Sequence, residues 1–503
     1  MKKSRGDVLK KQIFNPFLPL NKYIPDGEPH IFDDRIYLFG SHDKEGGDTF
    51  CALDYEFFSA PLDDLSNWSS KGINYSAKQD ALYSKERPYM YAPDVVRGND
   101  GRYYLYYCLA GNKGDGGYHG PISVAVCDTP DGKYEYLGYV KNQDGAEFNK
   151  FVCFDPAVMN DNGTIRLYYG TAMPREMCLP KPLKAVAAPI FEKIYGKSKD
   201  EILSEPGVWG ANMITLCDDM LTVKTDVVRI IPEKSRGTDF AGHGFFEGSS
   251  IRKINNTYYF IYSSQLNHEL CYATSKYPDR DFKYGGTIVS AGDIGLNGRR
   301  EKDSLNTVGT THGSIECING RWYVFYHRLT HGSDYSRQAC AEPIEIKADG
   351  SIEQTEISSC GLNSKPLIAK GKYPSVIACH ITNGKMPRVS NKQCKKPIPM
   401  VTHKSDERYI ANIDGKTTIT YKWFDFENQN GTLELDIDSN ADGEIQVFAN
   451  GKTIAQKRIT PFGRKTIPLC YQIESKNKQE LSIRFFGKGK FDLYSLNFKE
   501  NKI

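Results

Sequence analysis

The amino-acid sequence predicts an all-β protein in which a five-bladed β-propeller is followed by a β-sandwich of the jelly-roll type. Three observations support this fold class. Tyr, Phe, Gly and Pro are abundant, five aromatic segments recur along the first 360 residues, and apolar and polar residues alternate again toward the C-terminal end. This composition is typical of many short strands joined by tight turns.

Each recurring segment is short and aromatic, and a turn signal precedes it. The segments are Arg35–Ser41, Arg102–Ala110, Thr164–Ala172, Thr257–Ser264 and Arg321–Leu329. Their starts are 67, 62, 93 and 64 residues apart, and the long step contains an insertion rich in Lys and Pro around Pro174–Pro206. A period of roughly 60–65 residues indicates propeller blades with several strands each. The alternative, a large sandwich with accidental aromatic strands, requires no fixed period.

A short motif with one polar side chain lies upstream of each aromatic segment. The motifs are Pro25-Asp26-Gly27, Pro93-Asp94-Val95, Asp155-Pro156-Ala157, Glu247-Gly248-Ser249 and His312-Gly313-Ser314. Any one of them is compatible with an ordinary turn. In a propeller, however, the first strand of each blade lines the central channel, so equivalent positions converge near the axis. Carboxylates that converge there are costly to desolvate and repel one another, which indicates a functional site.

Separate carboxylates in one cleft are suited to glycoside hydrolysis. One carboxyl group that stays protonated donates its proton to the leaving oxygen, and an ionised one activates water or attacks the anomeric carbon. Their environments must push the two pKa values apart, and a third carboxylate helps the acid to keep its proton.

The ordered set of motifs resembles glycoside hydrolase family 43, a family of five-bladed propellers. The resemblance covers roughly residues 15 to 350 and is carried by Ile24–His30, Tyr91–Val95, Phe154–Ala157, Phe246–Ser250 and His312–Ser314. It implies an inverting mechanism with Asp26 as the general base and Glu247 as the general acid. It also implies that Asp155 raises the pKa of Glu247 and orients it. Asp94 would hold substrate hydroxyls or fix the loop around the site.

Two further residues take expected roles from this resemblance. His312 matches a blade-five histidine that supports a metal ion, usually calcium, through waters in the channel; a hydrogen-bonded histidine without metal is the alternative. Arg337 matches a recurring arginine that would pair with Asp155 or bind a sugar hydroxyl, with an interblade ion pair as the alternative. No organic cofactor is implied. For His42, His243 and Trp209, ordinary packing is favoured over lining the sugar pocket.

The pattern changes after Cys360. We expect the propeller to span residues 1–360, a Lys- and Pro-rich connector to span 361–405 and the sandwich to span 406–503. Gly431–Asp438 alternates apolar and acidic residues, as a half-buried strand does. The last region resembles carbohydrate-binding module family 6 through Tyr421–Phe426 and Gly487–Phe498. Sugar binding by this region and a purely structural role both stay open.

Charge, hydropathy and cysteine content narrow the functional class. The net charge of +3 is spread without long blocks, which argues against a nucleic-acid binder. No apolar run approaches the ~18–20 residues that span a bilayer, and no signal peptide is recognised. Thirteen scattered cysteines without a CxxC pair favour reduced thiols and a cytoplasmic location.

We therefore expect a cytoplasmic exo-glycosidase that acts on short oligosaccharides from xylan degradation. It would release terminal pentoses as an α-L-arabinofuranosidase, a β-D-xylosidase or both. The alternatives are an endo-arabinanase and a glycan-binding propeller without catalysis, although the latter does not need a base, an acid and a tuning carboxylate. The oligomeric state is left open by the sequence.

Overall fold

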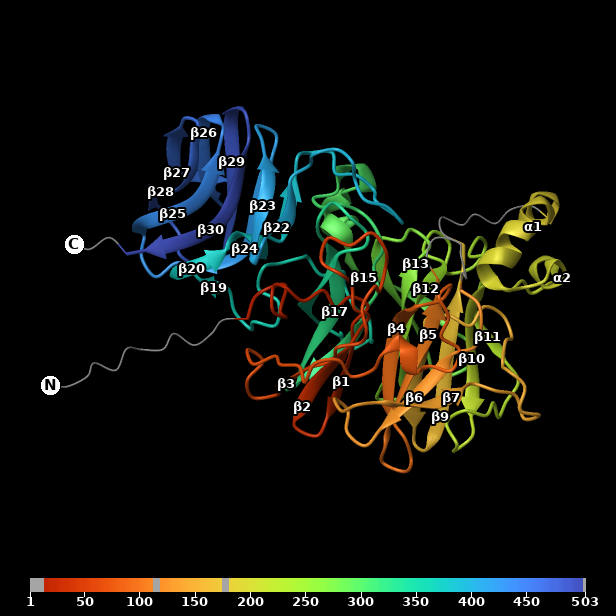
Figure 1. Ribbon diagram of the computed structural model, residues 1–503. Coiled ribbons are helices and arrows are strands. Elements are labelled where there is room, and N and C mark those ends of the chain that lie inside the picture. The colour runs from red at the N-terminus through yellow and green to blue at the C-terminus, as the bar shows by residue number, and fades with distance from the viewer. Residues whose placement is uncertain (1–12, 112–117, 174–180, 501–503) are drawn as a thin grey trace.

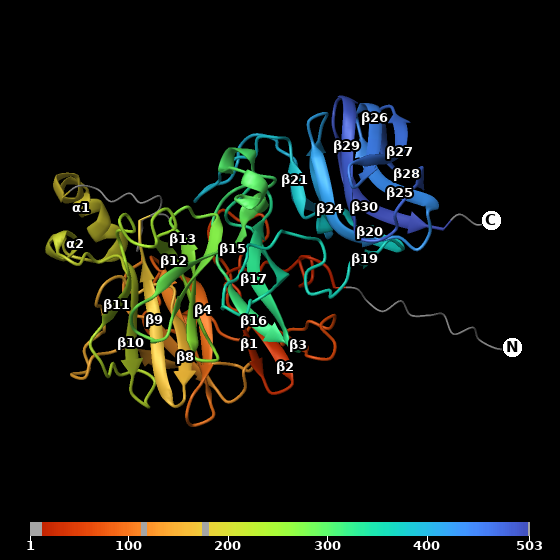
Figure 2. The ribbon, with the colours of Figure 1, turned by 180° about the vertical axis from the view of Figure 1, so that it is seen from behind.

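The computed structural model describes residues 13–111, 118–173 and 181–500 of the chain. It contains a propeller and a sandwich that lie beside each other, with two helices at the far end of the propeller from the sandwich (Figures 1 and 2). The all-β prediction is confirmed. None of the helices in the described residues is long and apolar enough to cross a membrane.

Five antiparallel sheets form the propeller blades, and the strands of each blade follow one another in the sequence. Blade one is β1 (Glu28–Phe32), β2 (Arg35–Phe39) and β3 (Phe58–Pro61). Blade two is β4 (Tyr89–Arg97), β5 (Tyr103–Ala110), β6 (Ser123–Cys127) and β7 (Glu135–Tyr139). Blade three is β8 (Ala157–Asp161), β9 (Thr164–Thr171), β10 (Gly210–Leu216) and β11 (Val228–Pro232).

The last two blades complete the ring. Blade four is β12 (Phe245–Ile254), β13 (Thr257–Ser264), β14 (Glu269–Ser275) and β15 (Lys283–Ser290). Blade five is β16 (Ser314–Ile318), β17 (Arg321–Leu329) and β18 (Arg337–Ile344). The first strands of neighbouring blades contact one another around the axis, including β1 against β16. The five polar motifs of the sequence thus reach the channel from five sides.

The aromatic segments have apolar residues at nearly every position because the second strand of a blade is buried on both faces. In β5, Tyr104 and Tyr106 pack into the apolar cluster between blades two and three. Tyr103 and Tyr107 point the other way, into the cluster between blades one and two. Successive side chains of a strand alternate between faces, so a strand between two cores has apolar residues at every position.

The N-terminal segment closes the ring through one side chain. The Nδ2 group of Asn15 donates hydrogen bonds to the carbonyls of Ala341 and Ser358 and to Glu342 Oε1, at 3.0, 3.1 and 2.8 Å. Its Oδ1 accepts from the backbone N–H of Ala341 at 3.0 Å. Both polar ends of a buried amide are thus satisfied, which ties the start of the propeller to blade five.

The insertion in blade three contains two helices, α1 (Lys181–Tyr195) and α2 (Lys199–Leu203). Phe191 and Tyr195 of α1 make edge contacts with the buried Trp209. The described chain also has five short 3₁₀ turns, at Ala77–Gln79, Ala291–Asp293, Leu296–Gly298, Glu301–Asp303 and Ser375–Ile377.

Two six-stranded sheets form the sandwich. One contains β19 (Leu367–Ile368), β21 (His380–Thr382), β24 (Thr418–Asp425), β26 (Asp442–Ala449), β27 (Lys452–Ile459) and β29 (Gln479–Lys488). The other contains β20 (Gly371–Pro374), β22 (Met400–Lys404), β23 (Glu407–Ile413), β25 (Asn430–Ser439), β28 (Phe462–Gln472) and β30 (Phe491–Lys499). Leu433, Leu435 and Ile437 of β25 are buried in the core between the sheets, as their alternation predicts.

The segment 361–405 differs from the expected connector. It contributes β19, β20, β21 and β22, four strands of two to five residues that join both sandwich sheets. Strands this short show no alternation that a sequence pattern could reveal. Between them, residues 386–394, here called the strap, run along blade five through backbone bridges from Val308 to Arg388 and from Ser333 to Gln393.

Ion pairs and hydrogen bonds fix the sandwich to the propeller. Arg408 of β23 binds both carboxylate oxygens of Glu45, at 3.1 and 2.5 Å. His403 of β22 lies 2.9 Å from the ring of His331, which follows β17. On another part of the interface, His380 lies 3.1 Å from the buried carboxylate of Asp293. Contacts at separate places restrict rotation between the two units.

Candidate active site

The predicted catalytic residues meet in one cavity. Asp26, Asp155, Glu247, His312 and Arg337 all line a hollow of about 490 Å³. This volume lies in the range of small-molecule sites, roughly 300–1,000 Å³. Asp26 and Asp155 are buried at its closed end, whereas Glu247 is half-buried. The cavity therefore has a floor of charged groups and an open mouth.

Local backbone geometry directs these carboxylates into the cavity. Asp26 and Asp155 adopt left-handed φ angles of 56° and 45°, each just before the first strand of its blade. Aspartate tolerates this region better than most residues, yet such a conformation costs ~1–3 kcal/mol and is concentrated at functional sites. Gly248, next to Glu247, has a φ of 73°, and a side chain there would press against the ring of His312.

Asp26 is kept ionised by one positive neighbour, Arg337. Its Oδ1 accepts a hydrogen bond from Arg337 Nη1 at 2.8 Å. Burial acts to raise the pKa of Asp26, but the guanidinium of Arg337, helped by a hydrogen bond from Ser41, outweighs it and holds the pKa below its ordinary value. An ionised carboxylate beside the cavity is the form that a general base requires.

His327 holds the backbone of Asp26 and was not singled out in the sequence. Its Nδ1 accepts the N–H of Asp26 at 3.4 Å, and its Nε2 lies 3.0 Å from the carbonyl of Thr310. These partners fit a neutral ring with the proton on Nε2. Burial, with Arg337 next, lowers the pKa of His327 to about 3, so the ring stays neutral over the physiological range.

The environment of Glu247 has the opposite effect from that of Asp26, because it raises the pKa. Burial raises its pKa well above the ordinary value, and the carboxylates of Asp155 and Asp26 raise it further. Asp155 also accepts a hydrogen bond from the N–H of Gly248 at 2.9 Å, which fixes the chain beside Glu247. Burial and the charge of Asp26 raise the pKa of Asp155 as well. The site thus pairs a carboxyl group whose pKa is lowered, Asp26, with one whose pKa is raised, Glu247, which is the division that an acid–base pair needs.

The partner of Arg337 differs from the expectation. Its guanidinium does not pair with Asp155. It binds Asp26 and, through Nε and Nη2, both oxygens of the buried Asp43, at 2.8 and 3.0 Å. Asp43 follows blade-one strand β2 and belongs to no recurring motif, so no pattern in the sequence indicated it. Arg337 is a link within the site between blade five and blade one.

Asp94 does not line the cavity, so its contacts agree with the second of its two expected roles, fixing the loop around the site, and not with binding substrate hydroxyls. Its Oδ1 lies 2.7 Å from His30 Nε2 and accepts the N–H of Val95, and its Oδ2 accepts the N–H of Val158 at 2.6 Å. Both oxygens are therefore engaged by the protein. Asp94 joins blades one, two and three below the catalytic carboxylates, where it supports the site.

The charged groups of the channel beside the cavity are relevant to the expected calcium ion. Glu28 accepts hydrogen bonds from Ser250 Oγ at 3.0 Å and pairs with Arg252 at 2.6 Å, and Ser250 contacts Ser314. Burial raises the pKa of Glu28 to about 7. In this region the carboxylates outnumber the guanidinium groups: Asp26, Asp43, Glu28 and Asp94 face Arg252 and Arg337. A channel rich in carboxyl groups beside the imidazole of His312 fits a hydrated cation.

His312 itself lies between the catalytic carboxylates. Its Nδ1 is 3.8 Å from Asp26 Oδ1 and 3.9 Å from Asp155 Oδ2. Burial lowers its pKa, so the ring is neutral and has a lone pair to offer. His312 would be the protein ligand of such a cation, which would supply positive charge to the channel floor.

Sequence reasoning included Tyr91 and Phe154 in its motifs but missed most of the rest of the cavity wall. One side is aromatic and includes Phe50, Tyr91, Tyr118, Phe154 and Tyr195, of which Tyr195 comes from α1. Rings of this kind present flat apolar faces to sugars. Another side is formed by residues of the strap, namely Arg388, Ser390, Asn391 and Lys392. His42, His243 and Trp209 do not line this cavity, which agrees with the packing interpretation.

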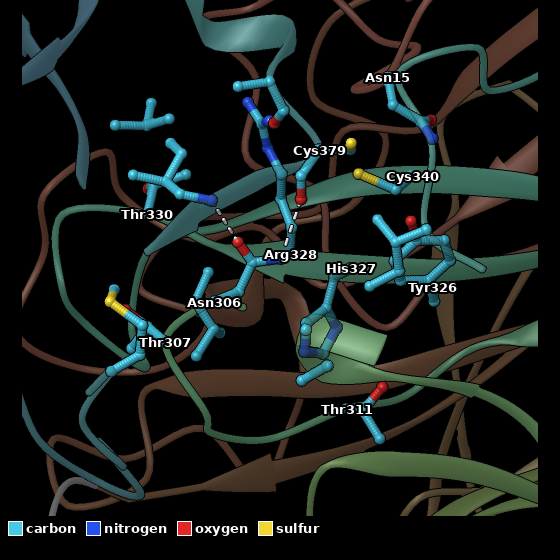
Figure 3. A pocket seen from close by; sticks show the side chains of 18 of the residues that line it. Asn15, Asn306, Thr307, Thr311, Tyr326, His327, Arg328, Thr330, Cys340 and Cys379 are labelled. Atoms are coloured by element: carbon cyan, nitrogen blue, oxygen red, sulfur yellow. Dashed lines mark hydrogen bonds between the residues drawn. The ribbon is translucent and has the colours of Figure 1, made fainter. Parts of the chain in front are cut away.

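A second hollow lies between blade five and the segment that leads to the sandwich (Figure 3). It is lined by His327 and Arg328 of β17, Cys340 of β18 and Cys379, and its volume is about 60 Å³. That space holds a few water molecules, since one needs roughly 10–15 Å³ by this measure. It is too small for a sugar.

Comparison with known proteins agrees with this chemistry. The profile of glycosyl hydrolases family 43 matches residues 15–352, two-thirds of the chain. The chain belongs to glycosyl hydrolase family 43. This family 43 enzyme is therefore an inverting glycoside hydrolase, as the motifs predicted.

Relatives of the family 43 enzyme cover different shares of its chain. It is 43% identical over 432 residues to a xylosidase/arabinosidase of Thermoclostridium stercorarium, covering 83% of this chain and 84% of that protein. It is 29% identical over 350 residues to xylosidase/arabinosidase 43A of Humicola insolens, covering 66% and 96%. A family 43 enzyme of Xanthomonas citri, solved with xylose, has a TM-score of 0.51 at 25% identity and covers 70% and 96%.

Proposed function

We propose that this family 43 enzyme releases terminal pentoses from oligosaccharides that contain arabinose or xylose, as an α-L-arabinofuranosidase, a β-D-xylosidase or both. The proposal rests on one observation: Asp26, whose pKa is lowered by Arg337, and Glu247, whose pKa is raised by burial, line the same sugar-sized cavity. The names of the relatives from Thermoclostridium stercorarium and Humicola insolens support the choice of pentoses.

The mechanism follows from the charges of the two carboxyl groups. Asp26, held ionised by Arg337, removes a proton from a water molecule that attacks the anomeric carbon. Glu247 donates its proton to the glycosidic oxygen as the bond to the leaving sugar breaks. Asp155 favours the protonated form of Glu247 until transfer and holds the adjacent N–H of Gly248. Attack from the face opposite to the leaving group inverts the anomeric configuration.

The shape of the cavity supports action at chain ends. Asp26, Asp155 and His312 close its inner end, and all three are buried. A terminal sugar fits against such a floor, whereas an internal sugar of a chain needs space on both sides. We therefore favour an exo-glycosidase over an endo-arabinanase.

Aryl glycosides test this proposal directly. We expect hydrolysis of 4-nitrophenyl α-L-arabinofuranoside, 4-nitrophenyl β-D-xyloside or both, with release of single pentoses from short oligosaccharides. Proton NMR during the reaction should show the inverted anomer first, because water attacks only once. Binding without turnover would support a glycan-binding propeller instead, and mid-chain cleavage of linear arabinan would support an endo-arabinanase.

The calcium proposal has its own test. We expect EDTA to lower the melting temperature and the activity, and added calcium to restore both, because the cation would balance the channel carboxylates. His312→Gln should remove the calcium-dependent shift in melting temperature. The half-buried His119, outside the channel, provides the control variant His119→Gln. An equal melting temperature with and without EDTA would contradict a calcium site.

The cellular location of the enzyme and the role of the sandwich are predictions. We place the enzyme in the cytoplasm, acting on small imported oligosaccharides from xylan degradation. The cysteines that the structure describes are all free thiols, which is compatible with a reducing compartment. For the sandwich, we favour a structural role at the propeller, supported by the ion pair of Arg408 with Glu45.

A further inference from the structure

The strap forms a wall of the active-site cavity although it lies outside the catalytic family's match. That match ends at residue 352, whereas Arg388, Ser390, Asn391 and Lys392 line the cavity. The relative from Humicola insolens aligns over 350 residues that make up 96% of its length. This enzyme thus completes its pocket with chain that follows the propeller.

The fold holds the strap in place through the buried carboxylate of Asp334. Its Oδ2 accepts the backbone N–H of Asn391 at 2.8 Å, and its Oδ1 accepts the N–H of Thr310 at 2.8 Å. The N–H of Asp334 in turn donates to the carbonyl of Lys392 at 3.1 Å. Because backbone groups make these bonds, the side chains of Asn391 and Lys392 remain available to a ligand.

Some side chains of the strap bind to the rest of the protein, and others are free to contact a ligand. Arg388 binds Glu301 at 2.7 Å and the carbonyl of Leu266 at 3.0 Å, so its guanidinium is engaged by the protein. The side chains of Asn391 and Lys392 are exposed, and neither has a hydrogen-bond or ion-pair partner within the part of the chain that the structure describes. An amide and an ammonium group together supply several donors and one acceptor, which suits sugar hydroxyls.

The depth of the cavity decides which sugar these groups meet. Asp26 and Asp155 lie buried at the floor, Glu247 is half-buried, and Asn391 and Lys392 are exposed at the mouth. The sugar to be released occupies the floor, and Glu247 protonates the oxygen that joins it to the rest of the substrate. The part of the substrate beyond that oxygen therefore lies toward the mouth, beside the strap.

We propose that Asn391 and Lys392 bind the leaving-group sugar and so determine which oligosaccharides the enzyme accepts. This inference rests on the proposed function and names the recognised group as a pyranose or furanose on the leaving side of the scissile bond. Lys392 donates hydrogen bonds to its hydroxyls, and the amide of Asn391 donates and accepts. Aryl leaving groups without hydroxyls cannot use these contacts.

The test compares two substrates with the same terminal pentose. The variants are Lys392→Met and Asn391→Gly; glycine is chosen because Asn391 has a φ of 54°, which other residues adopt at a cost. The substrates are the better 4-nitrophenyl pentoside and the matching trisaccharide, xylotriose or α-1,5-arabinotriose. We expect each variant to lower kcat/KM for the trisaccharide by about three- to tenfold, as for the loss of one hydrogen bond, and to leave the aryl pentoside within about twofold.

Lys395→Met is the matched control, because Lys395 is an exposed lysine close by that does not line the cavity. Equal losses on both substrates, or an unchanged rate on the trisaccharide, would overturn the proposal for the strap. If the unmodified enzyme hydrolyses no pentoside, the proposed function fails instead. Calorimetry of trisaccharide binding to Glu247→Gln, with and without Lys392→Met, then tests the strap by itself: equal affinity would refute it.

Discussion

Replacement of Glu247 by Gln is expected to lower turnover of a xylo- or arabino-oligosaccharide by about 10²–10⁴-fold, the usual contribution of one general acid. The reason is that a sugar leaving group needs a proton, and burial together with Asp155 keeps that proton on Glu247. On a 4-nitrophenyl pentoside the loss should be much smaller, because that leaving group departs without protonation. Steady-state kinetics on both substrates measure the difference.

The pH dependence provides a second readout for Glu247. In the unmodified enzyme, kcat/KM should fall at high pH as Glu247 loses its proton, and this limb lies at higher pH than for an ordinary glutamate because its pKa is raised. It should fall at low pH as Asp26 becomes protonated below its ordinary pKa. Glu247→Gln should remove only the high-pH limb. The exposed Glu345→Gln serves as the control, and equal losses on both leaving groups would exclude Glu247 as the acid.

Replacement of Asp26 by Asn is expected to lower kcat by about 10²–10⁴-fold on every substrate, including aryl pentosides. Activation of water is required whatever the leaving group, and an amide cannot accept its proton. Asn occupies nearly the same volume and tolerates the left-handed φ of 56°, so the fold should persist.

Binding measurements separate this chemical effect from a structural one. Asp26→Asn should still bind xylose or arabinose by calorimetry and should keep a cooperative thermal transition. It removes the negative partner of Arg337, but Asp43 still neutralises the guanidinium. Asp34→Asn, at an exposed turn of the same blade, is the control. Recovery of activity on aryl pentosides alone would contradict the role of Asp26 as the base.

The fold could be predicted because its repeats are periodic. Buried second strands produce aromatic runs such as Tyr103–Ala110, and their regular spacing indicates blades. The helices of the insertion in blade three could not be expected from the β-rich pattern around them. The strands within residues 361–405 are too short to show a period, and pairing with distant strands defines them.

Site residues could be predicted where they occupy equivalent positions in successive blades. They could not be predicted where they lie in a loop or insertion that occurs in one blade alone. Asp26, Asp155, Glu247 and His312 occupy equivalent positions at the start of inner strands, so the symmetry of the ring brings them together. The partner Asp43 and the wall residue Tyr195 lie in loops and insertions with no counterpart in other blades. Asp94 occupies an equivalent position, but its oxygens are taken by neighbouring backbone groups.

The contribution of the strap has a consequence for how such enzymes are divided and recombined. A propeller excised near residue 360 would keep its base and acid but would lose the side of the pocket that carries Asn391 and Lys392. We therefore expect that exchanging the C-terminal portion between homologues alters the range of substrates that the enzyme accepts. The wall of the pocket in this chain thus extends past residue 352, where the match to the catalytic family ends.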